Sequence, residues 1–171
     1  QSTLIALEAI KKNKLENNYS TELICIEPYE NNWLENLGIE IMRKKIEDVD
    51  LDLCKRLKAN DILFIDSSHI IRPQGDILKE FLEILPSLNP GVIIHIHDIY
   101  TPRNYPERWL KKENRFYNEQ YLLEAMLDNS NRYSVMLGLN FLKNDHFDKL
   151  KICCPYLKED TEPGSFYLRV N

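Results

Sequence analysis

Short apolar segments alternate with helical patterns along most of this chain, and this alternation is the feature that most constrains its fold. The apolar segments predict strands over residues 22–27, 38–43, 62–65 and 92–98. Periodic apolar patterns predict helices over residues 2–12, 31–37, 51–58 and 75–88. Because parallel strands are usually joined by a crossover helix, this order predicts an α/β fold with a mainly parallel, Rossmann-like sheet and helices on both faces.

The C-terminal part of the chain has a different pattern. A helix is predicted over residues 118–128, and β-rich segments follow over residues 133–142 and 165–170. The stretch between these two segments carries Pro155, Pro163 and Gly164 and is predicted to be a long loop. We therefore expect the last two strands to pair as an antiparallel hairpin, within one domain that spans residues 1–171.

Polar and ionisable residues gather at the carboxyl ends of the predicted strands. In "DILFIDSSHII", residues 61–71, an apolar run that predicts a strand buried on both faces turns abruptly polar. Ligands of open parallel sheets bind beyond the carboxyl ends of the strands. Three predicted strands end in ionisable residues, namely Glu27, Asp66, and the pair His97–Asp98. We expect these four side chains to lie along one edge of the sheet.

Each of these residues has a functional and a structural interpretation. Glu27 can accept hydrogen bonds from ribose hydroxyls, or it can be a solvated acid before a proline turn. If a helical turn begins at Asp66, then Asp66 and His69 lie on one side of it and can bind a cation or share proton transfer. Alternatively, Asp66 only caps that turn. Asp98 favours the first interpretation, because two carboxylates suit magnesium.

Residues 99–117 form a long polar and aromatic segment without a clear period. Tyr100 and Trp109 can line an apolar pocket, and Arg103 can bind an acidic or hydroxylated substrate, if the segment is a lid. The alternative is a surface loop that is packed by its own aromatic side chains.

Composition excludes several classes of protein. The net charge is −5 and the basic residues are scattered, which disfavours a nucleic-acid partner. No apolar run approaches the roughly 20 residues that span a bilayer, so no membrane partner is expected. None of the four cysteines forms a Cys-x-x-Cys pair. We expect free thiols in a reducing compartment, and hence a cytoplasmic protein.

The segments "LICIEP", "ILFIDSSH", "LNPGVIIHIHDIY", "NEQYLLEAML" and "GSFYLRV" together resemble class I S-adenosylmethionine-dependent methyltransferases. The resemblance is most specific from Asp61 to Tyr100, where the chain is similar to the small-molecule and sugar O-methyltransferase branch. It implies that Glu27 binds the cofactor ribose, that Glu47 and Asp48 approach the adenine, and that Asp66 also lies at the cofactor.

The same resemblance implies roles at the reaction centre. Asp66 and Asp98 would hold magnesium, and His69 would be the general base. The substrate, a small molecule or saccharide with a hydroxyl acceptor, would meet His97, Tyr100, Arg103 and Trp109.

The start of the chain departs from the family pattern. A glycine-rich turn should precede "STLIALEAI", but the five glycines all lie elsewhere. With Gln1 in place of an initiating Met, we expect a fragment that lacks the first strand and its glycine-rich loop. One alternative is a non-catalytic scaffold on the same fold. A nicotinamide-dependent oxidoreductase is a second, although no Tyr-x-x-x-Lys motif is present.

Overall fold

The protein is described by a computed structural model that covers residues 2–29 and 31–171. The chain divides into two units, Gln1–Asp48 and Val49–Asn171, and each is described here by itself. No helix in the described ranges is both long enough and apolar enough to cross a membrane. The fold is mixed α/β, with both parallel and antiparallel strand pairs.

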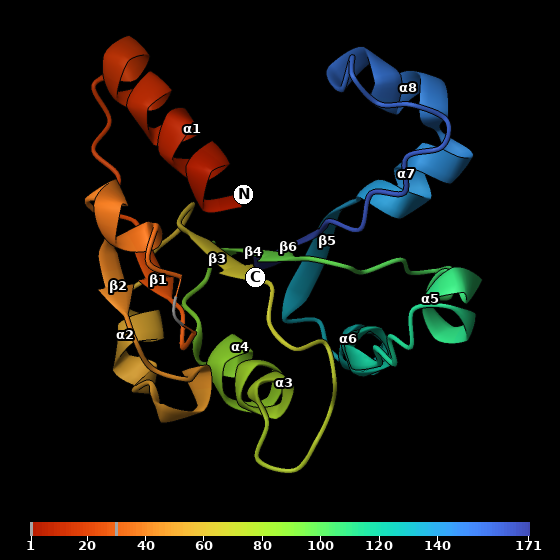
Figure 1. Ribbon diagram of the computed structural model, residues 1–171, viewed down its shortest axis with the longest axis horizontal. Coiled ribbons are helices and arrows are strands. Elements are labelled where there is room, and N and C mark those ends of the chain that lie inside the picture. The colour runs from red at the N-terminus through yellow and green to blue at the C-terminus, as the bar shows by residue number, and fades with distance from the viewer. Residues whose placement is uncertain (1, 30) are drawn as a thin grey trace. The chain divides into compact units, whose positions relative to one another are not determined.

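The first unit holds a long helix and a small parallel sheet (Figure 1). Helix α1 spans Ser2–Asn17, which extends the predicted helix by more than a turn. Strands β1 (Ile24–Ile26) and β2 (Glu40–Met42) pair in parallel, with the 3-10 helices η1 (Leu34–Leu37) and η2 (Ile46–Asp48) after each strand. Arg43 donates to the carbonyl oxygens of Glu27 and Tyr29 and so fixes the turn that follows β1.

The second unit is built on a four-stranded sheet of order β3-β4-β6-β5. These strands are β3 (Ile62–Ile65), β4 (Ile93–Ile96), β5 (Tyr133–Gly138) and β6 (Phe166–Val170). Strands β3 and β4 pair in parallel, whereas β6 is antiparallel to both β4 and β5. The predicted final pair is confirmed, but β6 lies inside the sheet, and the single predicted sheet is two sheets in the structure.

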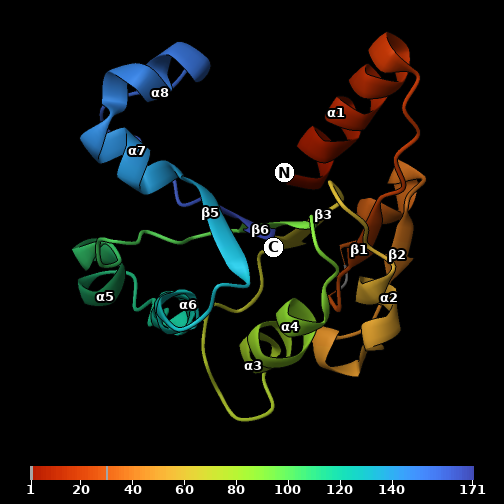
Figure 2. The same cartoon turned by 180° about the vertical axis from the view of Figure 1, so that it is seen from behind.

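Helices cover one face of this sheet (Figures 1 and 2). They are α3 (Asp76–Lys79), the π-helical turn η3 (Glu80–Ile84), α4 (Leu85–Ser87) and α6 (Glu119–Asp128). Their apolar side chains meet those of β4 and β6 in a core that includes Ile77, Phe81, Ile84, Leu85, Ile94, Ile96, Leu123 and Leu168. The short helix α2 (Leu51–Lys55) begins at an Asp50 cap, whose side chain accepts from the Asp52 amide.

The opposite face of the sheet differs from the prediction. Ile62 is 60% exposed, and Phe64 on the same face of β3 is also exposed. The run 62–65 is therefore not buried on both faces, because β3 is an edge strand and the helices of this unit cover the other face. The prediction of helices on both faces is not met within this unit.

The segment between β5 and β6 was also predicted wrongly. Residues 139–142 belong to helix α7 (Leu139–Asp145) and not to a strand. Helix α8 (Phe147–Cys153) follows where a long loop was predicted. Short apolar runs fit either structure, and here the strand ends at Gly138, where the chain leaves the sheet.

The one-sided core predicts unequal costs for two isoleucine truncations. Ile94→Ala removes a fully buried side chain on β4 and should lower the free energy of unfolding by about 2–5 kcal/mol. Ile62→Ala, the matched control on β3, should cost less than about 1 kcal/mol, because the side chain is already exposed. Urea denaturation of both variants measures the difference, and equal losses would contradict a core on one face only.

Candidate active site

The polar residues after β3 and β4 come together because these two strands are parallel and in register. Ile65 lies opposite Ile96, and the His97 amide donates to the Ile65 carbonyl oxygen at 2.9 Å. Both strands therefore end at the same level. Asp66 follows β3 and His97–Asp98 follow β4, so the predicted grouping at one sheet edge is present in this unit.

Four of these side chains form an alternating ring of acids and imidazoles, which we name the His–Asp cluster: Asp66, His69, His97 and Asp98. His69 Nε2 lies 3.5 Å from Asp66 Oδ1 and 3.9 Å from Asp98 Oδ2. His97 Nδ1 lies 3.1 Å from Asp98 Oδ1 and 3.6 Å from Asp66 Oδ1. Each carboxylate thus faces both imidazoles.

A third carboxylate, which sequence reasoning missed, lies behind His69. Glu119 begins helix α6, is fully buried, and pairs through Oε1 with His69 Nδ1. The backbone supports this pairing, because the Asn118 amide donates to the His69 carbonyl oxygen at 3.0 Å. An acid in the first turn of a helix is common for reasons of helix stability, so its sequence position did not single it out.

The surrounding carboxylates control the charge of both imidazoles. Burial lowers the pKa of His69, but the Asp66 and Glu119 carboxylates outweigh burial and raise that pKa to about 10. The contact with His69 in turn holds the pKa of Asp66 below its usual range. The Asp98 carboxylate raises the pKa of His97. The surroundings of His69 therefore favour the protonated, imidazolium form of its ring.

The backbone at the site is unusual at two positions. His69 has φ 60° and Asp98 has φ 56°, a left-handed conformation that non-glycine residues rarely adopt. Such strain persists only where neighbouring contacts hold it. At Asp98 the neighbour is Gly164, whose carbonyl oxygen accepts from the Ile99 amide at 2.7 Å. A Cβ on Gly164 would lie only 2.9 Å from the Asp98 Cα.

The predicted helical turn at Asp66 is absent, and two acids of a later helix hold this loop instead. Ser67 Oγ donates to Glu80 Oε2 at 2.8 Å. The backbone amide and hydroxyl of Ser68 donate to the two oxygens of Asp76, at 2.8 and 2.7 Å. Asp66 therefore caps no helix, because helical structure first appears at Asp76.

The aromatic segment is more ordered than its sequence indicates. It contains helix α5 (Glu107–Lys111), and Tyr100, Tyr105 and Trp109 pack as a buried cluster. Tyr117 packs against the edge of this cluster. The centroid of its ring lies 4.4 Å from the centroid of the His69 ring. The burial fits a segment packed by its own aromatic side chains. A substrate-binding role for Tyr100 and Trp109 stays a prediction.

Arg103, which is also predicted to bind substrate, pairs with Asp145 of α7 through Nη2 at 2.8 Å. The remaining predicted residues, Glu27, Glu47 and Asp48, belong to the first unit. Glu27 follows β1 and accepts from the Tyr29 amide through Oε1. Glu47 and Asp48 lie in η2. Their roles at a cofactor stay predictions.

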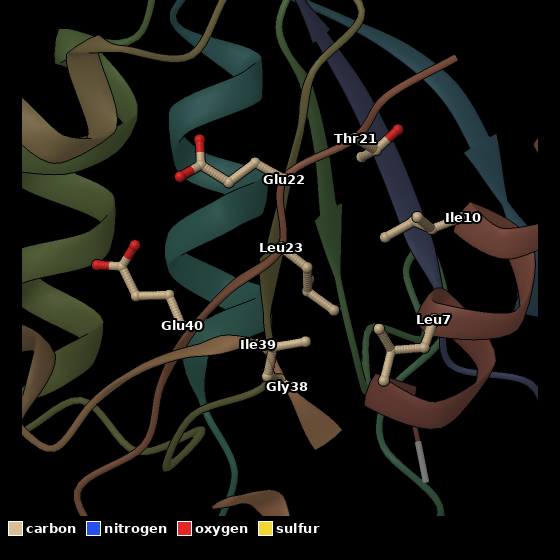
Figure 3. Close-up of a pocket in the computed structure, with 8 residues that line it drawn as sticks. All are labelled: Leu7, Ile10, Thr21, Glu22, Leu23, Gly38, Ile39 and Glu40. Atoms are coloured by element: carbon tan, nitrogen blue, oxygen red, sulfur yellow. The ribbon is translucent and has the colours of Figure 1, made fainter. Parts of the chain in front are cut away.

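A pocket of about 360 Å³ lies elsewhere in the first unit (Figure 3). Leu7 and Ile10 of α1 face Leu23 and Ile39 there, while the Glu22 and Glu40 carboxylates extend to the other side. Leu23 precedes β1 and Ile39 precedes β2, so the pocket lies at the amino ends of the strands. Glu27 follows the carboxyl end of β1, so this pocket is not the predicted ligand site.

The donor set of the cluster does not suit magnesium. Within residues 2–29 and 31–171, no group of three or more His, Cys, Asp or Glu side chains is arranged to hold a metal ion. Asp66 and Asp98, the two predicted ligands, face imidazoles instead. The structure gives the magnesium prediction no support.

One comparison with known proteins identifies the chain. A family model described as "Methyltransferase domain" matches residues 1–99, which is more than half of the sequence. The chain belongs to the methyltransferase domain family. The matched range includes the whole His–Asp cluster, whereas Glu119 and most of the aromatic segment of this methyltransferase domain lie outside it. No curated protein and no solved structure matched the chain.

Glu80, which supports the loop after β3 through Ser67, should make the stability of the protein depend on pH. Burial raises the pKa of Glu80 from 4.5 to about 8. The folded protein therefore binds this proton more tightly than the unfolded chain does. The resulting stabilisation is complete below pH 4.5 and is lost as pH rises through 8. Glu80→Gln removes the carboxyl that binds this proton, so the stability of the variant lacks this dependence on pH. Between pH 4.5 and 8 the variant should therefore become progressively more stable relative to the native protein.

Urea denaturation at several pH values measures the free energy of unfolding of both proteins. The difference between them should change by no more than about 1.4 kcal/mol per pH unit, the limit for one titrating group. Glu83→Gln is the matched control, because Glu83 lies on the same helix but is exposed and pairs with Lys79. A stability difference between Glu80→Gln and native protein that stays constant with pH would contradict the raised pKa.

Proposed function

We propose that the chain is an S-adenosylmethionine-dependent methyltransferase that transfers a methyl group to a hydroxyl of a small molecule or saccharide. The observation that supports this most is the His–Asp cluster at the carboxyl ends of β3 and β4, in a chain of the methyltransferase domain family. The carboxyl end is where ligands of open α/β sheets bind. The cluster offers groups that can bind a hydroxyl and accept its proton.

We assign the cofactor to the predicted acids. The geometry at Glu27 fits a ribose, because Oε1 is occupied by the Tyr29 amide and a ligand hydroxyl would bind through Oε2. Glu47 and Asp48 would approach the adenine. When bound, the cofactor supplies a methyl carbon on a positively charged sulfur, which an oxygen nucleophile can attack. The cluster carries more carboxylates than imidazoles once Glu119 is included, and this negative field suits a cation.

The chain's own residues would act mainly by positioning. Holding a hydroxyl oxygen in line with the methyl carbon removes most of the entropic cost of the displacement. Asp66 is partly exposed and faces both imidazoles, one of which takes the proton of the acceptor hydroxyl. His69 is the imidazole that the resemblance implies. We assign no step to magnesium, because the described part of the chain holds no group of side chains arranged to bind a metal ion.

Cofactor binding is tested by calorimetric titration of S-adenosylmethionine. Glu27→Gln should weaken binding about tenfold or more, because a carboxylate that accepts from a ribose hydroxyl becomes a neutral amide. Glu40→Gln is the matched control at the opposite end of the same small sheet and should bind as the native protein does. Equal affinities of the two variants would contradict the assignment of Glu27.

Catalysis is tested with the labelled methyl donor and a panel of sugars, phenols and other alcohols. The assay uses this chain and the longer protein that includes any residues its gene encodes before Gln1. Label in an acceptor supports the proposed activity. Cofactor binding without transfer to any acceptor, or no binding by either protein, would favour the scaffold alternative.

A further inference from the structure

We propose that His97, and not His69, accepts the proton of the acceptor hydroxyl. The inference rests on the proposed methyl transfer, and it concerns which of the two imidazoles in the His–Asp cluster has a ring nitrogen free to act. Four observations carry it: the contacts of each ring nitrogen, the exposure of each side chain, the ring that covers His69, and the carboxylate that orients His97.

His69 has no ring nitrogen left for an acceptor. Its Nδ1 pairs with Glu119, and its Nε2 faces Asp66 at 3.5 Å and Asp98 at 3.9 Å. A carboxylate favours hydrogen on the ring nitrogen that it faces, so the carboxylates around His69 favour hydrogen on both of its nitrogens. The side chain is only 7% exposed, and the Tyr117 ring covers it at 4.4 Å. His69 is thus a buried cation that three carboxylates surround.

His97 has the opposite arrangement. Its Nδ1 is buried, makes no hydrogen bond with the described residues, and lies 3.1 Å from Asp98 Oδ1, yet the side chain is 41% exposed. The exposed part of the ring is therefore the part away from Nδ1, which includes Nε2. Within the described part of the chain, no hydrogen bond or ion pair involves Nε2 of His97. Its ring neighbours are Phe64 and His95, with centroids at 6.3 and 6.5 Å.

A carboxylate that faces one ring nitrogen fixes the hydrogen there and leaves the other nitrogen as an acceptor. The Asp98 carboxylate lies 3.1 Å from Nδ1 of His97, and its negative charge favours hydrogen on that nitrogen and a lone pair on the exposed Nε2. Asp66 and Asp98 then stabilise the positive charge that His97 gains. His69 keeps the two acids in place from the buried side.

The proposed step balances in atoms and electrons. The hydroxyl oxygen forms a bond to the methyl carbon of S-adenosylmethionine, while the sulfur–methyl bond breaks and leaves its electron pair on a neutral thioether sulfur. The hydroxyl proton moves to Nε2 of His97. The products are the methyl ether, the thioether and a protonated His97, which returns its proton to water.

The first test needs no variant and no acceptor. Diethyl pyrocarbonate acylates imidazole nitrogens that are unprotonated and accessible, and peptide mass spectrometry locates the product. In mildly alkaline buffer we expect modification of His97 and of His146, an exposed histidine outside the cluster that serves as the positive control. His69 should stay unmodified. Modification of His69 with protection of His97 would overturn the proposal.

The second test is kinetic and uses the acceptor that the labelled-methyl panel identifies. His97→Gln should lower kcat roughly 100-fold or more, the usual scale of general base catalysis, with unchanged affinity for S-adenosylmethionine by calorimetry. His146→Gln is the matched control and should keep the native rate. A native rate in folded His97→Gln protein would overturn the proposal.

The two tests separate this inference from the proposed function. Absence of methyl transfer to every acceptor, with His97 modified and His69 protected, removes the function and with it the proposed step. Methyl transfer that survives His97→Gln keeps the function and rejects His97 as the base. Loss of transfer together with loss of cofactor affinity in His97→Gln would also reject it, because His97 would then act in binding the cofactor.

Discussion

The parallel pairing of β3 with β4 is the constraint on which the site depends. The register Ile65 opposite Ile96 ends both strands at one level. Side chains alternate between the two faces of a strand, so a slip of one residue would turn Ile94 and Ile96 out of the core. The apolar pattern that fills the core therefore also fixes which polar residues meet. Asp66, His97 and Asp98 come together because isoleucines are buried beneath them.

The cluster concentrates charge in a partly buried place, and the surrounding structure compensates for it. One protonated imidazole faces three carboxylates, which is favourable only because the partners are already positioned. Asp76 and Glu80 hold the two serines between Asp66 and His69, and Gly164, just before β6, packs against Asp98. Glu119 Oε2 is buried without a hydrogen-bond partner among the described residues, a cost that the contact with His69 offsets.

Local sequence predicted the elements that carry the site but not everything around it. The strands near residues 62–65 and 92–98 and the helix between them were predicted because period and turn residues agree there. Glu119 was missed because its partner lies 50 residues away, and no local pattern records such a contact. Residues 139–142, the first part of helix α7, were predicted to be strand because their apolar run is too short to show a period. One face of β3 is exposed because β3 lies at the edge of its sheet. The order of strands in a sheet cannot be deduced from the apolar pattern of one strand.

The position of β3 at the edge of its sheet has a consequence for the behaviour of the protein in solution. An apolar edge strand with free backbone groups is a template for pairing with another chain. The residues of β3 are all apolar, with acids directly before it at Asp61 and directly after it at Asp66. Charges that flank an apolar strand act as gatekeepers against such association. Asp66 thus lies both in the His–Asp cluster and at the end of this apolar strand, where a negative charge disfavours edge-to-edge pairing.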